Sequence, residues 1–343
     1  MFKDMLSQVV AGGDLSRREA ARAMEAIMSG AASEAQIGAL AAALKIKGET
    51  SEEIAGFAQT MRDLAVKVSC SDREVFDTCG TGGDGRGTIN VSTAAAFVLA
   101  GAGVPVAKHG NRGMSSPCGS ADVLEALGIR IDLPADAAAE AIARTNLCFC
   151  FAPLYHPAMK YAAKPRRELG FRTFFNLLGP LTNPAGASRQ LVGVYQPDLT
   201  EKIADVLRQL GTKRAMVVHS FDGLDEISAA APTRVAEVVA GEIRSYIVEP
   251  TNYGLSGDAG AYKGGTAADN AAAILAVLGG ERGGRRDVVL INAAAALMVA
   301  DRAENLREGL ALAAASIDSG AALGSLAALR QFGRSYGEGL PLS

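Results

Sequence analysis

The feature that most constrains this 343-residue chain is an alternation of strand-like and helix-like segments that begins near residue 74. Glu74–Cys79 has the pattern of a strand, a glycine-rich turn follows it, and Ser92–Ala102 has the pattern of a helix. Further strands are predicted at Val104–Ala107, Arg130–Leu133 and Leu147–Phe151, and further helices at Ala121–Leu127 and Ala135–Thr145. Alternation at this spacing is typical of βαβ units, which place their strands in a parallel sheet.

The regular alternation lapses over Pro153–Ala187, a stretch rich in proline and aromatic residues, and then resumes. Strands are predicted at Leu191–Tyr195, Arg214–His219 and Ile243–Val248, and helices at Leu199–Leu210, Ala267–Leu278, Asp287–Ala300 and Asn305–Ser319. The length suits two domains, or one large α/β domain with an appendage. The sequence therefore predicts an α/β fold with a mostly parallel central sheet.

The first seventy residues show helical patterns and no strand pattern. Ser16, Ser33 and Thr50 are each followed three residues later by Glu or Gln, which is the capping-box pattern of a helix start. Apolar residues follow these starts at helical spacing. We therefore expect a small helical unit ahead of the α/β unit.

Composition narrows the class of protein further. Hydrophobic residues make up 49% of the chain and charged residues 21%, which excludes disorder. The net charge is −3, from 34 Lys+Arg and 37 Asp+Glu, and this argues against bulk binding of nucleic acid. Five cysteines without a CxxC spacing favour a reducing compartment over a disulfide framework or a zinc site. The 39 glycines are in excess, and they cluster between Gly80 and Gly119.

Membrane insertion is not expected. Thr88–Ala107 is uncharged for 20 residues, but it contains Asn90, Pro105 and two glycines and is interpreted as a buried helix followed by a buried strand. The N-terminal residues carry charge and lack the apolar core of a signal peptide. We therefore expect a cytoplasmic protein with no membrane partner.

The glycine-rich segment Gly80–Gly85 follows a predicted strand and precedes a predicted helix. It matches the dinucleotide-binding pattern GxGxxG, yet the next strand ends in Lys108 and His109 where that class of protein needs an acid for the ribose. A P-loop is also excluded, because no Gly-Lys-Ser/Thr follows at the required spacing. Backbone amides of the loop and a helix N-terminus then predict an anion site, with a plain tight turn as the alternative.

Three further polar segments follow predicted strands or begin predicted helices. Asn90–Thr93 opens the next helix, where these residues either cap it or contact a phosphate or a hydrated cation. Lys108–Ser116 combines cations and hydroxyls in a loop after a strand, where ligands bind in open α/β sheets. Gly119–Asp122 begins another helix and offers a further N-terminal anion contact.

Acidic residues and arginines complete the set of candidate binding groups. Asp222, Asp225 and Glu226 follow the strand Arg214–His219 and form either a site for a hard cation or a solvated turn. Arg166 and Arg167 lie near aromatic residues, where an arginine can bind a carboxylate. Together these segments predict Mg²⁺, a polyphosphate and a small acid as ligands.

Six motifs of the chain resemble, in order and spacing, the anthranilate phosphoribosyltransferase family. They are Asp77–Asp84 (DTCGTGGD), Asn90–Thr93 (NVST), Lys108–Arg112 (KHGNR), Gly119–Asp122 (GSAD), Asn176–Pro184 (NLLGPLTNP) and Asp225–Glu226. The resemblance covers essentially the whole chain. It implies transfer of the phosphoribosyl group of 5-phosphoribosyl 1-diphosphate to anthranilate, giving N-(5-phosphoribosyl)anthranilate and diphosphate, the second step of tryptophan biosynthesis from chorismate.

The resemblance also implies an architecture of the nucleoside phosphorylase/phosphoribosyltransferase kind. A helical domain would comprise residues 1–69 with a second segment at about 163–184, and residues 70–343 would form the α/β domain. A homodimer through the helical domain is expected, with small molecules rather than nucleic acid or membrane as the other partners.

The resemblance assigns roles to residues at matching positions. Lys108, Asp225 and Glu226 would be catalytic, and Ser92, Asp225 and Glu226 would position Mg²⁺. Gly80, Asn111 and Arg166 would bind anthranilate, with His109, Tyr155 and His156 near it. The phosphoribosyl donor would contact Gly80, Gly83, Asp84, Thr88, Asn90, Val91, Ser92, Thr93, Lys108, His109, Gly110, Asn111, Arg112, Gly113, Met114, Ser115, Ser116 and Ser120.

One position departs from the family pattern, and one rival fold relative is excluded. Pro117 stands where the family often has a basic residue, which puts a cation at that point in doubt. A pyrimidine nucleoside phosphorylase would need a Lys-His-Ser-Thr-Gly-Gly pattern, which the chain lacks.

Overall fold

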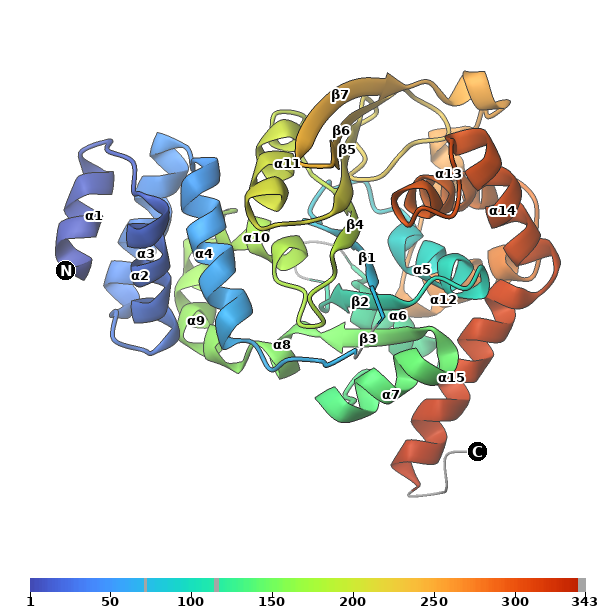
Figure 1. Cartoon of the computed structure of the whole chain (residues 1–343), viewed down its shortest axis with the longest axis horizontal. Coiled ribbons are helices and arrows are strands. Elements are labelled where there is room, and N and C mark those ends of the chain that lie inside the picture. Colours follow the sequence, from blue (N-terminus) through green and yellow to red (C-terminus); the bar gives the residue numbers. More distant parts are fainter. Residues whose placement is uncertain (71–72, 114–116, 339–343) are drawn as a thin grey trace.

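Seven strands form one sheet in the order β3-β2-β1-β4-β5-β6-β7 in the computed structural model, which describes residues 1–70, 73–113 and 117–338 (Figure 1). The strands are β1 (Phe76–Gly80), β2 (Val106–Gly110), β3 (Leu147–Phe151), β4 (Arg189–Gly193), β5 (Arg214–Ser220), β6 (Thr233–Val239) and β7 (Glu242–Val248). Strands β1 to β5 pair in parallel, whereas β6 and β7 are antiparallel. The predicted α/β fold with a mostly parallel sheet is confirmed.

A helical unit lies beside the sheet, at the left of Figure 1. It contains α1 (Phe2–Val10), α2 (Arg17–Met28), α3 (Glu34–Lys47) and α4 (Ser51–Leu64), and α9 (Lys160–Leu169) from the middle of the chain packs against α2 and α3. The three predicted capping boxes are present at Ser16, Ser33 and Thr50. Each satisfies backbone amides that a helix start leaves without partners.

The segment Pro153–Ala187, for which no regular alternation was predicted, links the two units. It forms two short helices, α8 (Ala152–Tyr155) and α10 (Phe175–Leu178), in addition to α9. Phe174 lies on Phe57 of α4, with 4.5 Å between the ring centroids. The side chains of this segment share one hydrophobic core with α1 to α4, with α11 (Leu199–Gln209) and with one face of the sheet.

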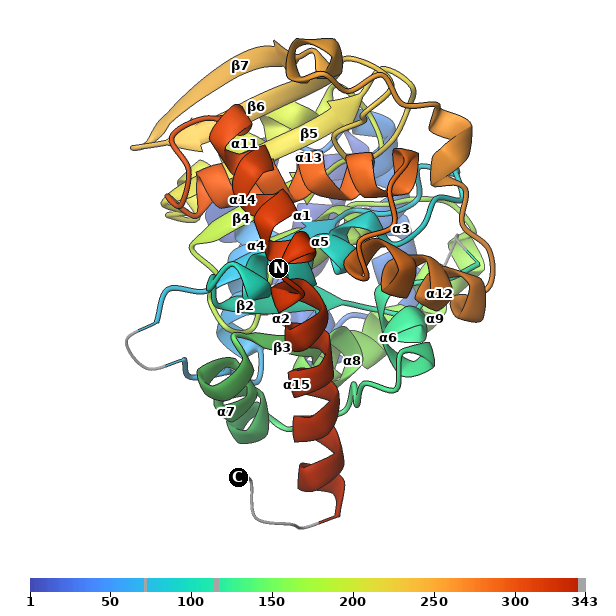
Figure 2. The same ribbon diagram turned by 90° about the vertical axis from the view of Figure 1, so that its right-hand side faces the viewer.

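The other face of the sheet carries the remaining helices, several of which face the viewer in Figure 2. These are α5 (Val91–Gly101), α6 (Ser120–Ala126), α7 (Ala135–Thr145), α12 (Ala267–Leu278), α13 (Gly284–Val299), α14 (Leu306–Asp318) and α15 (Ala321–Gly337). The uncharged stretch Thr88–Ala107 becomes the buried helix α5 and the start of β2, as predicted. Burial against the sheet explains its lack of charge.

The prediction of a strand at Arg130–Leu133 is wrong. Ile129, Ile131 and Leu133 are buried in alternation, which is why the segment has a strand pattern. However, the segment pairs with no strand, and Arg130 instead packs against Gly333 of α15. Besides the helices within Pro153–Ala187, the prediction omitted β6, whose antiparallel pairing departs from the βαβ pattern, and α15, which follows the last predicted helix.

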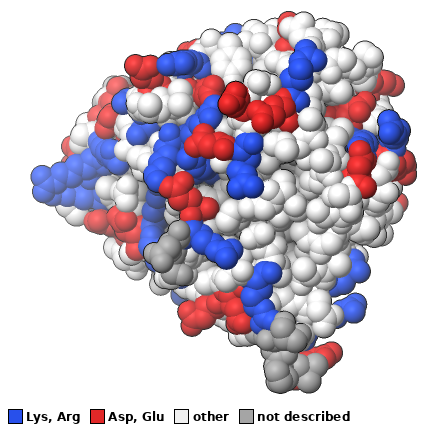
Figure 3. Space-filling view, turned by 45° about the vertical axis from the view of Figure 1, so that its right-hand side comes forward, with Lys and Arg blue, Asp and Glu red and all other residues white. Residues whose placement is uncertain are grey.

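Two surface properties bear on possible partners. In the described part of the chain no single helix is long and apolar enough to cross a membrane, and α14 and α15 meet those criteria only together, with a bend of 59° between them. On the face shown in Figure 3, Lys and Arg lie interspersed with Asp and Glu, and wide areas carry no charge. This distribution agrees with the net charge of −3.

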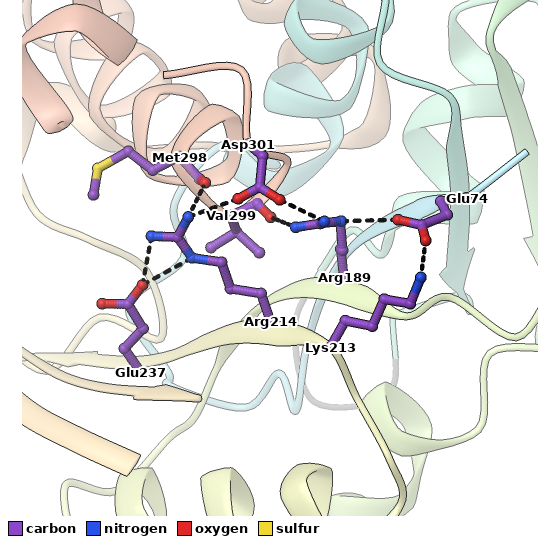
Figure 4. Close-up of polar contacts among 8 residues, drawn as sticks. All are labelled: Glu74, Arg189, Lys213, Arg214, Glu237, Met298, Val299 and Asp301. Carbon is purple, nitrogen blue, oxygen red and sulfur yellow. Dashed lines mark hydrogen bonds and ion pairs between the residues drawn. The ribbon is translucent and has the colours of Figure 1, made fainter. Parts of the chain in front are cut away.

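An ion-pair network joins α13 to the sheet at the ends of the strands opposite to the glycine loop (Figure 4). Arg214 of β5 binds Glu237 of β6 at 2.8 Å, Asp301 at 2.8 Å and the backbone oxygen of Met298 at 2.8 Å. Arg189 of β4 donates to the backbone oxygen of Val299 at 2.7 Å. Cations at a helix C-terminus satisfy its carbonyls and interact favourably with its dipole, so this network fixes α13.

We predict that Arg214→Met lowers the free energy of unfolding by about 2–3 kcal/mol, because Glu237, Asp301 and the backbone oxygen of Met298 lose a charged partner. Urea denaturation measures the loss. Arg244→Met is the matched control, since its pair with Glu242 is 68% and 72% exposed, and its expected cost is below about 0.5 kcal/mol. Equal losses for the two variants would contradict the role given to the network.

Candidate functional site

The carboxyl ends of β1, β2 and β4 form the edge of the sheet at which polar side chains converge. The chain runs outward from β1 through β2 to β3, and from β4 to β5 on the other side, so the strand order reverses between β1 and β4. Ligands of open α/β sheets bind at such a reversal. The site predicted from sequence therefore lies where this architecture places a ligand.

Glycines end β1 and β4 because the acidic turn lies directly against them. A Cβ atom on Gly193 would lie 1.6 Å from the backbone oxygen of Asp225, a distance that no side chain tolerates. A Cβ atom on Gly80 would lie 3.2 Å from Oδ2 of Asp225. The turn Asp222–Glu226, which follows β5, is thus in contact with the glycine-rich loop that follows β1.

Asn90, at the start of α5, binds neighbouring segments of the chain and does not cap the helix. Asn90 occupies the N-cap position, yet its side chain makes no capping hydrogen bond. Its Nδ2 donates to the backbone oxygen of Cys118 at 3.3 Å, and its Oδ1 accepts from Nδ2 of Asn270 in α12 at 2.9 Å. The backbone amide of Ser92 donates to Oε1 of Glu226 at 3.1 Å. The helix start therefore meets the acidic turn, and capping by Asn90 is excluded.

Lys108 brings a buried positive charge to the same point. Its side chain is 3% exposed, and its Nζ donates to the backbone oxygen of Thr78 and, at 3.3 Å, to Oγ of Ser92. A buried ammonium requires hydrogen-bond acceptors and nearby negative charge. Both are present. Thr78 and Ser92 supply the acceptors, and Asp77 and Glu226 interact electrostatically with Lys108. Asp225 belongs to the same group of charges.

The acids at this edge repel one another. Removal from water raises the pKa of Asp225, and the charge of Asp84 raises it further. Removal from water likewise raises the pKa of Glu226, and the charge of Asp225 adds to the effect while Lys108 opposes it. Crowded carboxylates of this kind need more positive charge nearby than one lysine provides.

The donor set suits a hard divalent cation that is held only in part by protein. Carboxylate and hydroxyl oxygens are the ligands that Mg²⁺ prefers, and Mg²⁺ usually takes one or two carboxylates together with water and substrate phosphates. Asp225, Glu226 and Ser92 supply such oxygens at one place. In residues 1–70, 73–113 and 117–338 no group of three or more His, Cys, Asp or Glu forms a cage for a metal. The residues present fit Mg²⁺ with a polyphosphate rather than Mg²⁺ alone.

Two buried histidines lie where the helical unit meets the sheet. Burial lowers the pKa of His109 to about 3 and that of His156 to about 4, so both are neutral near pH 7. Nδ1 of His109 lies 2.9 Å from the backbone oxygen of Gly179, which accepts only a hydrogen bond, so the proton is on Nδ1. Nε2 of His109 then carries a lone pair, and it has no partner in the described part of the chain.

Arg166 and Arg167 differ in burial and in their contacts. The guanidinium of Arg166, in α9, is half-buried and lies over the ring of Phe175 at 5.3 Å, whereas Arg167 is exposed. Arg166 makes no ion pair with any described residue. Its charge is therefore available to an anion.

Other predicted contacts are engaged within the protein. Arg112 forms ion pairs with Asp122 at 3.0 Å and Glu125 at 2.5 Å, and the hydroxyl of Tyr155 donates to the backbone oxygen of Leu133 at 2.7 Å. Ser120 donates to the backbone oxygen of Asn111 at 3.3 Å. Met114, Ser115 and Ser116 lie outside the described residues.

Sequence analysis assigned no role to Asp77, although it belongs to a quoted motif. Its carboxylate is fully buried in β1 and accepts from the backbone amide of His109 at 3.0 Å and from Nδ2 of Asn183 at 2.8 Å. Burial raises its pKa to about 6. Asp77 thus joins β1 to β2 and to the segment that leads from the helical unit. Two signals were available in the sequence: an acidic residue inside a predicted buried strand, and its place in the motif Asp77–Asp84.

Models of known protein families match both units of this fold. The model described as the glycosyl transferase family a/b domain matches residues 72–323, and the model of that family's helical bundle domain matches residues 3–65. The chain therefore belongs to this glycosyltransferase family.

Named relatives narrow the family. An anthranilate phosphoribosyltransferase of Moorella thermoacetica is 58% identical over 96% of this chain and 97% of its own length, and one of Methanocorpusculum labreanum is 54% identical over 95% and 96%. The crystal structure of the Thermus thermophilus enzyme superposes with a TM-score of 0.91 at 42% identity, covering 96% of this chain and 99% of the other. The Saccharomyces cerevisiae enzyme in complex with PRPP and Mg gives 0.89 at 26% identity, covering 97% and 98%. The chain belongs to the anthranilate phosphoribosyltransferases.

We predict that Asp225→Asn stabilises the ligand-free protein at pH 8. Because the folded-state pKa of Asp225 is raised above its unfolded value, the folded state binds more protons, and stability falls as pH rises from about 4 through the raised pKa. Asn removes that penalty, so the gain should shrink as the pH is lowered toward 4. Thermal unfolding at several pH values measures it, with the exposed Asp198→Asn as control. A variant less stable than wild type at pH 8 would refute the repulsion.

Proposed function

We propose that this anthranilate phosphoribosyltransferase transfers the phosphoribosyl group of 5-phosphoribosyl 1-diphosphate to the amine of anthranilate at the sheet edge formed by β1, β2 and β4. The observation that carries the proposal is the convergence of Lys108, Ser92 and Glu226 beside the glycine-rich loop. This arrangement combines a buried cation, a helix N-terminus and acidic oxygens in one place. A diphosphate with a divalent cation requires that combination.

The donor cradle consists of backbone amides and hydroxyls from three segments. The end of β1 would supply Gly80, and the loop after it Gly83 and Asp84. The segment before α5 and the start of that helix would supply Thr88 and Asn90–Thr93. The end of β2 and the residues after it would supply Lys108–Gly113, and the start of α6 would supply Ser120. The predicted contacts Met114, Ser115 and Ser116 lie outside the described residues. Arg112 would have to leave Asp122 and Glu125 to reach a phosphate, so we place it at the edge of the cradle.

Mg²⁺ would be held by Asp225, Glu226 and Ser92. When bound there, the ion neutralises part of the charge of the diphosphate as it leaves. The yeast relative, whose solved complex contains PRPP and Mg, supports this proposal. The mutual repulsion of the carboxylates supports it independently, since a cation relieves that repulsion.

The chemistry follows from where charge develops. Breaking the bond between ribose C1 and the diphosphate leaves positive charge on the sugar and negative charge on the leaving group. Lys108 and the backbone amides of the loop would stabilise the negative charge of the leaving group. Because these groups are already in place, the site needs no rearrangement to do so. The acceptor amine attacks C1 from the opposite face with its own lone pair, so the protein need only position the two reactants.

Anthranilate would bind on the side of the helical unit. The guanidinium of Arg166 can bind its carboxylate, while Gly80 and Asn111 contact the rest of the molecule. Nε2 of His109 can accept a hydrogen bond there. A pKa of about 3 makes His109 a weak base, so we assign it hydrogen bonding rather than general-base catalysis.

The proposal also covers the domain boundaries, the oligomeric state and the cellular location. The helical domain would comprise residues 1–69 and about 163–184, with the α/β domain at 70–343, and the shared hydrophobic core supports the joining of the two helical segments. A homodimer through the helical domain is proposed on the exposed side chains of Val10 and Ile46. A reducing, cytoplasmic setting is proposed because the five cysteines, all of them described, form no disulfide.

We predict that the double variant Asp225→Asn, Glu226→Gln loses transfer activity by on the order of 10³-fold at saturating Mg²⁺, because both carboxylate ligands are gone. A fluorescence assay of anthranilate consumption, run with and without the phosphoribosyl donor and Mg²⁺, measures the rate. Circular dichroism verifies that the variant is folded. Wild-type turnover in the folded double variant would remove the metal assignment.

We predict that Arg166→Ala raises the KM for anthranilate by roughly 10- to 100-fold, because a carboxylate loses a charged hydrogen-bonding partner. The KM for the phosphoribosyl donor should change far less. Arg167→Ala is the matched control, since it removes the same side chain from the exposed neighbouring position. Equal effects on both substrates, or an equal effect of the control, would exclude the carboxylate role.

A further inference from the structure

A buried asparagine of α13 holds the chain directly after the acidic pair. Asn292 is fully buried within a run of alanine and aliphatic residues. Its Oδ1 accepts from the backbone amide of Ile227 at 3.0 Å, and its Nδ2 donates to the backbone oxygen of Ile227 at 2.8 Å. Nδ2 also donates to the backbone oxygen of Val288 at 2.8 Å, one turn earlier in the same helix. One side chain thus binds both backbone groups of the residue that follows Glu226.

The acidic turn is restrained on its other sides by different means. The backbone amide of Ser220 donates to the oxygen of Leu224 at 3.0 Å, which closes the turn on β5. The backbone oxygen of Asp225 lies against Gly193 of β4. Oγ of Ser228 donates to Oδ2 of Asp222 at 2.8 Å. Asn292 supplies the restraint from the helix layer, and it acts at the C-terminal side of Glu226.

An amide suits this position for an electrostatic reason. Asp84, Asp225 and Glu226 already repel one another, so an acid at position 292 would add a further negative charge nearby. A lysine or arginine there would pair with the carboxylates and compete with a metal ion. Asparagine offers one acceptor and one donor pair without a net charge, and burying its polar atoms is tolerated only because they are all hydrogen-bonded.

We propose that Asn292 is a positioning residue, which sets the place of Asp225 and Glu226 through the backbone of Ile227 and thereby tunes how the site takes up Mg²⁺ with the phosphoribosyl donor. The inference rests on the proposed function of the acidic pair. Asn292 touches neither substrate nor reacting atoms. Groups that hold metal ligands in place commonly change metal affinity or activity by one to two orders of magnitude when they are removed.

Two variants separate positioning from packing. Asn292→Leu has a similar size and removes both contacts with Ile227, whereas Asn292→Ala removes the same contacts with a smaller side chain, and neither variant adds a charge. Ser325→Ala is the matched control, because Oγ of Ser325 is buried in the same core and donates to the backbone oxygen of Phe97 at 3.0 Å, in α5. It removes a buried hydrogen bond without touching the acidic turn.

The first readout is the Mg²⁺ concentration that gives half-maximal activity at a fixed donor concentration. We expect it to rise on the order of tenfold in Asn292→Leu and also to rise in Asn292→Ala, with the KM for anthranilate nearly unchanged. The second readout needs no turnover. It is the increase in Tm that Mg²⁺ and the donor together produce, which should be smaller in both Asn292 variants than in wild type and the same in Ser325→Ala.

The outcomes distinguish the inference from its foundation. A lower Tm of the free variants with an unchanged ligand-induced increase and an unchanged Mg²⁺ requirement would make Asn292 a packing residue and overturn the inference. If Asn292→Leu does not fold, Asn292→Ala decides by the same two readouts. If wild type itself shows no Mg²⁺-dependent gain in Tm with the donor, the assignment of the acidic pair fails, and the inference fails with it.

Discussion

The site depends on a set of opposite charges that the fold buries at one edge of its sheet. Lys108 reaches from β2 to Thr78 and Ser92, while Glu226 accepts from the backbone of Ser92. Neither charge would be stable in the interior alone, because removing an ion from water costs several kcal/mol. The two signs therefore hold strand, helix start and acidic turn together, and the excess of negative charge makes the edge receptive to a cation.

Neutral asparagine side chains fix the segments of this charged sheet edge by hydrogen bonds. Asn183 binds Asp77, Asn270 binds Asn90, and Asn292 binds the backbone of Ile227. Asn270 and Asn292 lie on helices and Asn183 lies in the segment before β4, and each reaches a segment that carries candidate site residues. Because an amide adds no net charge, these contacts fix geometry and leave the electrostatic balance to Lys108 and the acids. The opposite ends of β4 and β5 are secured differently, by arginines on the C-terminus of α13 (Figure 4).

Local sequence patterns predicted much of the fold. They succeeded where a single physical cause, such as helix capping or burial, decides the local structure. The capping boxes at Ser16, Ser33 and Thr50 depend on neighbours along the chain, and they occur as predicted. The strand Leu147–Phe151 also occurs as predicted, because its apolar run is buried in the sheet beside β2. Arg130–Leu133 shows the limit, since alternating burial resembles a strand when the partner is the helix α15. The strand β6 was missed although its partners β5 and β7 are its neighbours along the chain, because an antiparallel hairpin departs from the βαβ alternation on which the prediction rested.

The sequence by itself determined the chemistry of this protein: glycine loops, hydroxyls, Lys108, the pair Asp225–Glu226 and Arg166 follow one another in an order typical of one family. Only the tertiary structure decided which of these groups act together. It set Ser92 beside Glu226 across 134 positions of chain, engaged Arg112 with Asp122 and Glu125, and left Arg166 without an ion pair among the described residues. The reason is that burial and charge pairing depend on distances in space, whereas a motif records only separations along the chain.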